Sequence, residues 1–80
     1  MNQIEKIIYS WIKKKDKNIK LSDNLNSNNI IDSFEMMELI IFCEKKFKIQ
    51  FKEKDLINEN FKSIKKISLM IANYKKNKSN

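Results

Sequence analysis

The chain of 80 residues contains no Gly, Pro, His, Arg, Val or Thr, and it contains one Cys. Tight hairpin turns favour Gly, so its absence, together with that of Pro, indicates helices joined by Asn- and Asp-rich connections. With no His and a single Cys, the chain lacks the usual ligands of a zinc site and cannot form a Ser-His-Asp arrangement. One Cys cannot close an internal disulfide, so nothing indicates an oxidising compartment. We therefore expect an all-α protein that is not an enzyme and holds no metal.

Long apolar segments are also missing. The longest unbroken apolar run extends from Leu39 to Cys43, and Glu38 and Glu44 close it at both ends. A bilayer span needs about 20 apolar residues. The N-terminus lacks the basic start and apolar segment of a secretory signal. These features predict a cytoplasmic protein without stable membrane insertion.

Positive charge dominates, since 17 Lys are set against 10 acidic residues and give a net charge of +7. Lys, Asn and Ile make up more than half of the chain, a bias that AT-rich codon usage explains without any anionic partner. The Lys clusters at 13–15 and 45–46 nevertheless leave a small basic nucleic-acid-binding protein as an alternative. Base recognition relies strongly on Arg, so its absence argues against nucleic acid as a partner.

The N-terminal segment carries a helical pattern of apolar residues. They lie at spacings of i, i+3, i+4, i+7 and i+8 and comprise Ile4, Ile7, Ile8, Trp11 and Ile12. This spacing predicts an amphipathic helix over about residues 2–15. Residues 16–32 are polar and Asn-rich, and their few apolar residues keep no helical period. They predict a long loop pinned to the core, and loops of this length are often functional.

A second helix is predicted over about residues 33–46. Asp32 is a favoured N-cap residue, and Glu35 stands where it would complete a capping box. In helical projection one face collects Met36, Leu39, Ile40, Cys43 and Phe47, which we expect to form the core face. Cys43 is therefore interpreted as a small buried hydrophobic residue rather than a nucleophile.

The remaining segment predicts two further helices. Residues 55–57 are consistent with a single helical turn, and the last helix is expected to begin near Asn60. Its core stripe comprises Phe61, Ile64, Ile67 or Ser68, Ile71 and Tyr74. The basic residues 75–80 predict a frayed, solvated tail. No linker or repeat divides the chain, so we expect a single domain over residues 1–80.

Four short segments carry a likeness to a known family: Ile30–Phe34, Glu38–Ile40, Glu44–Ile49 and Asn60–Ile64. Together with the helix order and the long loop, they resemble the acyl carrier protein family over roughly residues 4–74. The resemblance implies an acyl-carrier-like four-helix bundle, with a long loop between its first two helices and a short third helix. Ile31 directly before Asp32 and Ser33 looks more like D-alanyl, peptidyl or specialised freestanding carriers than like the housekeeping fatty-acid carrier.

The candidate site is Ser33, at the predicted start of the second helix. There, free backbone N–H groups and the positive end of the helix dipole favour a phosphate ester. By resemblance, a phosphopantetheinyl transferase moves 4′-phosphopantetheine from coenzyme A to Ser33, and Asp32 caps the helix and assists attachment by helping to hold the metal of the transferase. The arm would carry a thioester-linked acyl or aminoacyl group. A loading (adenylating) enzyme and downstream acyl-accepting enzymes are then the expected partners. Taken alone, the Asp-Ser pair is more typical of a plain helix cap.

A second set of residues projects away from the predicted core face: Phe34, Met37, Glu38 and Ile41. The resemblance implies that partner enzymes contact them. Two alternatives remain, since the apolar members could widen the core against the long loop or serve an unmodified helical interaction module. Residues 21–44 contain five acids and no Lys, which predicts an acidic surface around Ser33 that attracts basic partners. We expect a monomer.

Overall fold

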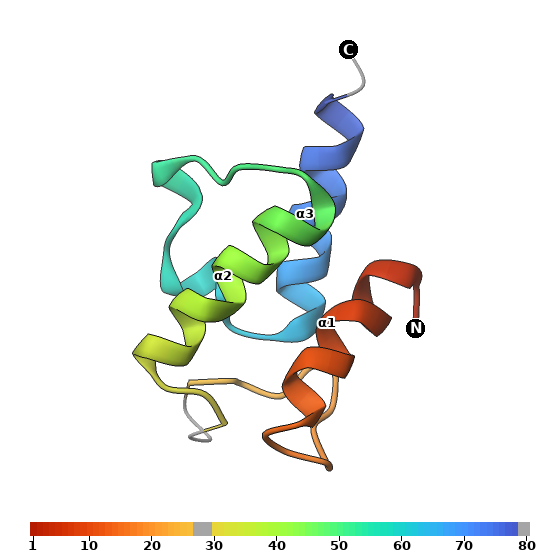
Figure 1. Ribbon diagram of the computed structural model, residues 1–80, viewed down its shortest axis with the longest axis vertical. Coiled ribbons are helices and arrows are strands. Elements are labelled where there is room, and N and C mark those ends of the chain that lie inside the picture. The colour runs from red at the N-terminus through yellow and green to blue at the C-terminus, as the bar shows by residue number, and fades with distance from the viewer. Residues whose placement is uncertain (27–29, 79–80) are drawn as a thin grey trace.

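The computed structural model describes residues 1–26 and 30–78. Its elements are three α-helices and two short 3₁₀ helices: α1 (Gln3–Lys13), α2 (Ser33–Phe47), η1 (Glu53–Asp55), η2 (Asn58–Phe61) and α3 (Ile64–Lys78). No strand occurs in the two described ranges, so the predicted all-α class is confirmed. α1 packs against α3, and Figure 1 shows α2 lying obliquely beside both helices.

The helices and the loop before α2 enclose one hydrophobic cluster. Its buried members are Ile8, Ile12, Ile19, Leu25, Ile31, Leu39, Cys43, Phe47, Phe51, Phe61, Ile64, Ile67 and Ile71. The apolar stripes predicted for the three long helices supply most of them, while Met36 and Ile40 of α2 are partly buried at its edge. Burial of such side chains stabilises a fold in proportion to the apolar area removed from water. This cluster therefore holds α2, and with it the start of the helix at Ser33, in a fixed position.

α1 and α2 begin with the same hydrogen-bonding arrangement. At α1, the Asn2 side chain accepts from the Glu5 N–H at 2.8 Å, and Glu5 accepts from the Asn2 N–H at 2.9 Å. At α2, Asp32 accepts from the Glu35 N–H at 2.8 Å, and Glu35 accepts from the Asp32 N–H at 3.0 Å. The capping box predicted for α2 is therefore confirmed, and it fixes where the second helix begins.

Two backbone hydrogen bonds hold the loop between α1 and α2 against the start of α3. The Leu25 N–H donates to the Lys62 carbonyl at 2.8 Å, and the Lys65 N–H donates to the Leu21 carbonyl at 3.0 Å. The side chain of Leu25 is fully buried. The loop is thus pinned to the core as predicted, while residues 27–29 of that loop lie outside the described residues.

The segment between α2 and α3 differs from the prediction. The short helix expected at residues 55–57 is not formed, because η1 ends at Asp55 and the next two residues, Leu56 and Ile57, are 44% and 52% exposed. Residues 52–60 contain only these two apolar residues, which are adjacent in the sequence and so do not form the repeating stripe of a buried α-helix. In the part of the chain that the structure describes, two 3₁₀ helices therefore stand where a third α-helix was expected.

α3 begins and ends later than predicted. Asn60 does not cap it, because it lies in η2 and its side-chain amide donates to the Asp55 carbonyl at 2.9 Å. The helix starts at Ile64 and continues through residues 75–78, which were expected to fray. Residues 79–80, the remainder of the expected tail, lie outside the described residues.

Tyr74 of α3 holds the link between α2 and α3 in place. Its hydroxyl donates to the carboxylate of Asp55 and accepts the backbone N–H of Lys52 at 2.8 Å. Its ring centroid lies 5.4 Å from that of Phe51. Partial burial, and then the hydrogen bond to Asp55, raise the pKa of Tyr74, so the hydroxyl that donates to Asp55 stays protonated at neutral pH.

Tyr74→Phe is expected to lower the free energy of unfolding by about 1 kcal/mol, because it removes this hydrogen bonding and keeps the ring. Since the pKa is raised in the folded state, the loss should be full below the ordinary pKa of 10.0 and shrink as the pH rises above it. Urea unfolding followed by circular dichroism measures both effects. Tyr9→Phe, at a partly buried tyrosine of α1, is the matched control. Equal losses in the two variants would contradict the role of the Tyr74 hydroxyl.

Candidate functional site

α2 places Ser33 on the surface at its first position. Ser33 is exposed, and its hydroxyl forms no hydrogen bond with the residues that the structure describes. The adjacent groups are engaged, since the Asp32 side chain accepts the Glu35 N–H and the Asp32 carbonyl accepts the Met36 N–H at 2.9 Å. The N–H groups of Ser33 and Phe34 precede the first intrahelical bond, where an anion can be bound.

A lysine from the turn that follows α1 reaches this helix start. The Lys15 Nζ lies 2.7 Å from Glu35 Oε2, and the two side chains remain 30% and 28% exposed. Their hydrogen bond raises the pKa of Lys15 and lowers that of Glu35. The carboxylates of Glu38 and Asp32 add smaller increases to the pKa of Lys15. The surface expected to be acidic and free of Lys therefore contains one, which the fold brings in from a distant segment.

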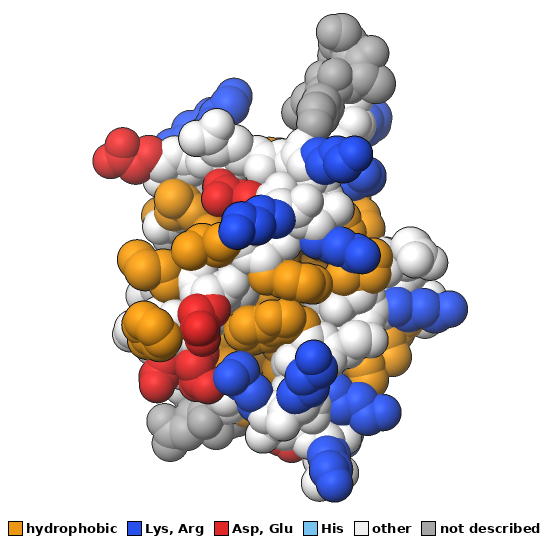
Figure 2. All heavy atoms as spheres, viewed as in Figure 1, with side chains coloured by type: hydrophobic (Ala, Val, Ile, Leu, Met, Phe, Trp, Pro, Cys, Tyr) orange, Lys and Arg blue, Asp and Glu red, His pale blue; other side chains and the backbone are white. Residues whose placement is uncertain are grey.

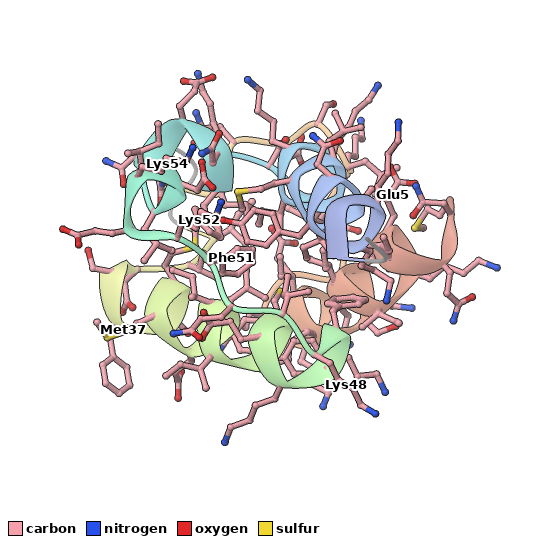
Figure 3. All side chains as sticks on the ribbon, turned by 90° about the horizontal axis from the view of Figure 1, so that it is seen from above. Glu5, Met37, Lys48, Phe51, Lys52 and Lys54 are labelled. Atoms are coloured by element: carbon pink, nitrogen blue, oxygen red, sulfur yellow. The ribbon has the colours of Figure 1, made fainter. Side chains whose placement is uncertain are left out.

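The four residues predicted to meet partners lie on the outer side of α2. Phe34, Met37 and Ile41 are 71%, 62% and 47% exposed, and Glu38 is exposed as well. Figure 3 shows Met37 pointing away from the core. In Figure 2, acidic and apolar side chains gather over the N-terminal half of α2. These four residues, here called the α2 outer face, do not widen the core, which removes one of the two alternatives to a partner surface.

Two exposed apolar residues near this surface were not identified from the sequence as site residues. Leu56 and Ile57 join η1 to η2, and this segment lies on the same side of the molecule as the N-terminal half of α2 in Figures 1 and 3. The sequence analysis placed both in a single helical turn and assigned them no role. The missed signal is that residues 52–60 contain no other apolar residue, and that these two are adjacent instead of three or four positions apart.

The site offers no reactive thiol and no metal cluster. Cys43 is fully buried in the core, as predicted, and burial raises the pKa of its thiol to about 12. The thiolate, which is the reactive form, is therefore scarce at neutral pH. Over residues 1–26 and 30–78, no group of three or more His, Cys, Asp and Glu side chains is placed to hold a metal ion.

The chain matches none of the protein-family models, curated proteins or solved structures with which it was compared. The fold class and the site consequently depend on the residues and their geometry. Within the described ranges, no helix combines the length and the apolar character needed to cross a membrane.

Proposed function

We propose that this chain is an acyl or aminoacyl carrier protein, which holds its cargo on a 4′-phosphopantetheine arm attached to Ser33. The observation that carries the proposal is the exposed Ser33 hydroxyl, without a hydrogen-bond partner among the described residues, at a capped helix start. Beside it, the α2 outer face offers exposed apolar side chains and a carboxylate. A hydroxyl to be modified and a surface to be contacted are the two features that a carrier needs.

The residues at the helix start fit a phosphate ester. Attachment forms a bond between Ser33 Oγ and a phosphorus atom of coenzyme A, adenosine 3′,5′-bisphosphate leaves, and the hydroxyl proton passes to the transferase. The N–H groups of Ser33 and Phe34 and the positive end of α2 favour the ester's negative charge. Asp32 keeps the helix start in place and presents an oxygen ligand of the kind that Mg²⁺ prefers. The attached arm supplies the thiol that carries the cargo.

In this proposal the α2 outer face, with Leu56 and Ile57, meets the transferase, the loading (adenylating) enzyme and the acyl-accepting enzymes. η1 and η2 then correspond to the short third helix of a carrier's four-helix bundle. The carboxylates of Asp32 and Glu38 orient basic partners, and Lys15 limits the negative charge beside Ser33. We assign the chain to the cytoplasm, as a monomeric and specialised carrier.

Intact-protein mass spectrometry tests the proposal directly. The wild-type chain is incubated with coenzyme A, Mg²⁺ and a broad-specificity phosphopantetheinyl transferase. We expect one mass increase equal to a single phosphopantetheine group. A folded chain that gains no mass would overturn the proposal. A gel shift with duplex DNA at physiological salt tests the nucleic-acid alternative, which tight and salt-sensitive binding would support.

Substitutions of Asp32 separate its two roles. Asp32→Ala is expected to lower the free energy of unfolding by about 1 kcal/mol, because the N-cap is lost. Asp32→Asn keeps the cap, since Asn and Asp cap helices equally well. Both variants lose the carboxylate, so we expect both to load more slowly than the wild type, by roughly tenfold or more. Urea unfolding and the rate of mass gain measure the two effects, and wild-type loading of Asp32→Asn would leave Asp32 as a cap alone.

A further inference from the structure

A second surface lies between α1 and α2, where the aromatic rings of the two helices meet. The rings of Trp11 and Phe42 stack with their centroids 6.0 Å apart and an angle of 30° between their planes. Together with Ile7 and Ser10, they line a groove of about 340 Å³. Trp11 and Phe42 are only partly buried, so the floor of the groove is apolar and accessible.

Lysines make up the rest of the groove lining. Lys6 and Lys14 come from the α1 side and Lys46 from the last turn of α2, and all three are exposed. Among the described residues, none that lines this groove is acidic. Figure 2 shows the arrangement as apolar surface between α2 and α1 with lysines around it. The groove therefore combines an apolar floor with a positively charged border.

A second hollow, of about 400 Å³, adjoins the first across the aromatic pair. Trp11 and Phe42 line it as well, and Ile41, Glu38 and Lys45 complete it. The two hollows share their aromatic residues, so apolar surface continues on both sides of the ring contact. An elongated ligand with apolar side chains at intervals fits such a surface better than a compact one.

We propose that this groove binds an acidic amphipathic helix of a partner protein. A helix docked in a groove buries side chains at i, i+3, i+4 and i+7, and here they would lie against Trp11 and Phe42. Carboxylates beside them would meet Lys6, Lys14 and Lys46, whose charge is opposite. Ser33 lines neither hollow, although the second hollow shares Glu38 and Ile41 with the α2 outer face. We therefore expect the unmodified chain to bind the helix as well as the modified chain does.

Two other anionic ligands fit the groove less well. Side chains that insert into a bilayer must project from the surface, whereas Trp11 and Phe42 lie in a groove and partly pack against each other. A nucleic-acid duplex presents phosphates but no apolar groups that could fill the floor. The combination of floor and border favours a ligand with both apolar and carboxylate side chains.

Fluorescence of Trp11, the only Trp of the chain, reports on the groove directly. The probe is a synthetic helical peptide of about 15 residues, with Leu at i, i+3, i+4 and i+7 and Glu at most other positions. We expect a saturable shift of the Trp11 emission to shorter wavelength, because the peptide excludes water from the ring. Added salt should weaken the binding, since exposed charges are screened.

Charge reversal at the border provides the main comparison. The groove triple variant carries Lys6→Glu, Lys14→Glu and Lys46→Glu. We expect it to bind the peptide at least about tenfold more weakly, because attraction becomes repulsion at three sites. The control triple variant carries Lys20→Glu, Lys54→Glu and Lys65→Glu, at exposed lysines outside the groove, and has the same net charge as the groove variant. Its affinity for the peptide should fall by less than about threefold. Ser10→Phe keeps every lysine and fills the floor, so it should also weaken binding.

Four outcomes would overturn the inference. They are an unchanged Trp11 emission at saturating peptide, equal losses in the two triple variants, and a larger response to phosphatidylglycerol vesicles or to duplex DNA than to the peptide. The fourth is an emission shift that follows the chain's own concentration, which would assign the groove to a second copy. None of these outcomes depends on whether Ser33 accepts phosphopantetheine.

Discussion

Ser33→Ala is expected to gain no phosphopantetheine under conditions that convert the wild-type chain completely. The substitution removes the hydroxyl oxygen that would form the phosphate ester, so the effect is a complete loss rather than a partial one. Ser22→Ala, at an exposed serine of the loop before α2, is the matched control and should gain mass as the wild type does. Intact-protein mass spectrometry measures the mass gain of the wild type and of both variants.

Unfolding of Ser33→Ala would not explain its expected loss of loading. Ser33 is exposed and its hydroxyl has no hydrogen-bond partner in the described part of the chain, so its replacement should alter the free energy of unfolding by less than about 0.5 kcal/mol. Urea unfolding followed by circular dichroism tests this expectation independently of the loading assay. Mass gain by Ser33→Ala would contradict the site, because the group would then be attached elsewhere.

The same variant distinguishes a carrier from an unmodified interaction module. A module that binds through the α2 outer face would keep its partner when Ser33 becomes Ala, because Phe34, Met37 and Ile41 are unchanged. A carrier would keep the contact with the transferase and still lose the product. Binding and loading, measured on one pair of proteins, therefore separate two functions that use the same surface.

The features that the sequence predicted correctly depend on residues close to one another along the chain. The capping box of α2 needs only Asp32 and Glu35, three positions apart, and both hydrogen bonds are present. The apolar stripes repeat within one or two turns, so the buried faces of α1, α2 and α3 followed from spacing alone. The position of Ser33 at the first residue of α2 followed for the same reason, because a helix start is specified locally.

The features that the sequence did not predict join segments that are distant along the chain. Lys15 reaches Glu35, and Tyr74 hydrogen-bonds to Asp55, only because α1, α2 and α3 pack as they do. Side-chain spacing within one helix contains no information about which lysine of another helix lies nearby. The 3₁₀ helices were missed because hydrophobic periodicity does not report segments of three or four residues.

The sequence alone likewise could not predict which side chains of α2 are exposed. Periodicity assigned Leu39 and Met37 to different faces, but it left open whether the loop before α2 covers the face that carries Met37. The structure leaves Met37 62% exposed and buries Leu39 completely. One helix thus supplies both the core and the proposed partner surface, and a substitution on either face should affect a different property.

Leu39→Ala is expected to remove much of the stability of the protein. Its side chain is fully buried in the hydrophobic cluster, and truncating such a leucine costs about 2–5 kcal/mol, including the cavity that is left. A chain of this length has a total stability of roughly 4–12 kcal/mol, and small domains lie toward the lower end. Urea unfolding, followed by circular dichroism, should therefore show a midpoint far below that of the wild type.

Met37→Ala is the matched control, since it shortens a large apolar side chain on the same helix, two residues away. With 62% of Met37 exposed, we expect the free energy of unfolding to change by less than about 0.5 kcal/mol. In function the order should be reversed, so that the loading rate falls in Met37→Ala and not in folded Leu39→Ala, because Met37 belongs to the α2 outer face. Met37→Ala should load more slowly while remaining folded, whereas Leu39→Ala should load normally in whatever fraction stays folded. Equal destabilisation by the two substitutions would mean that α2 buries both faces, and the α2 outer face would then be unable to receive a partner.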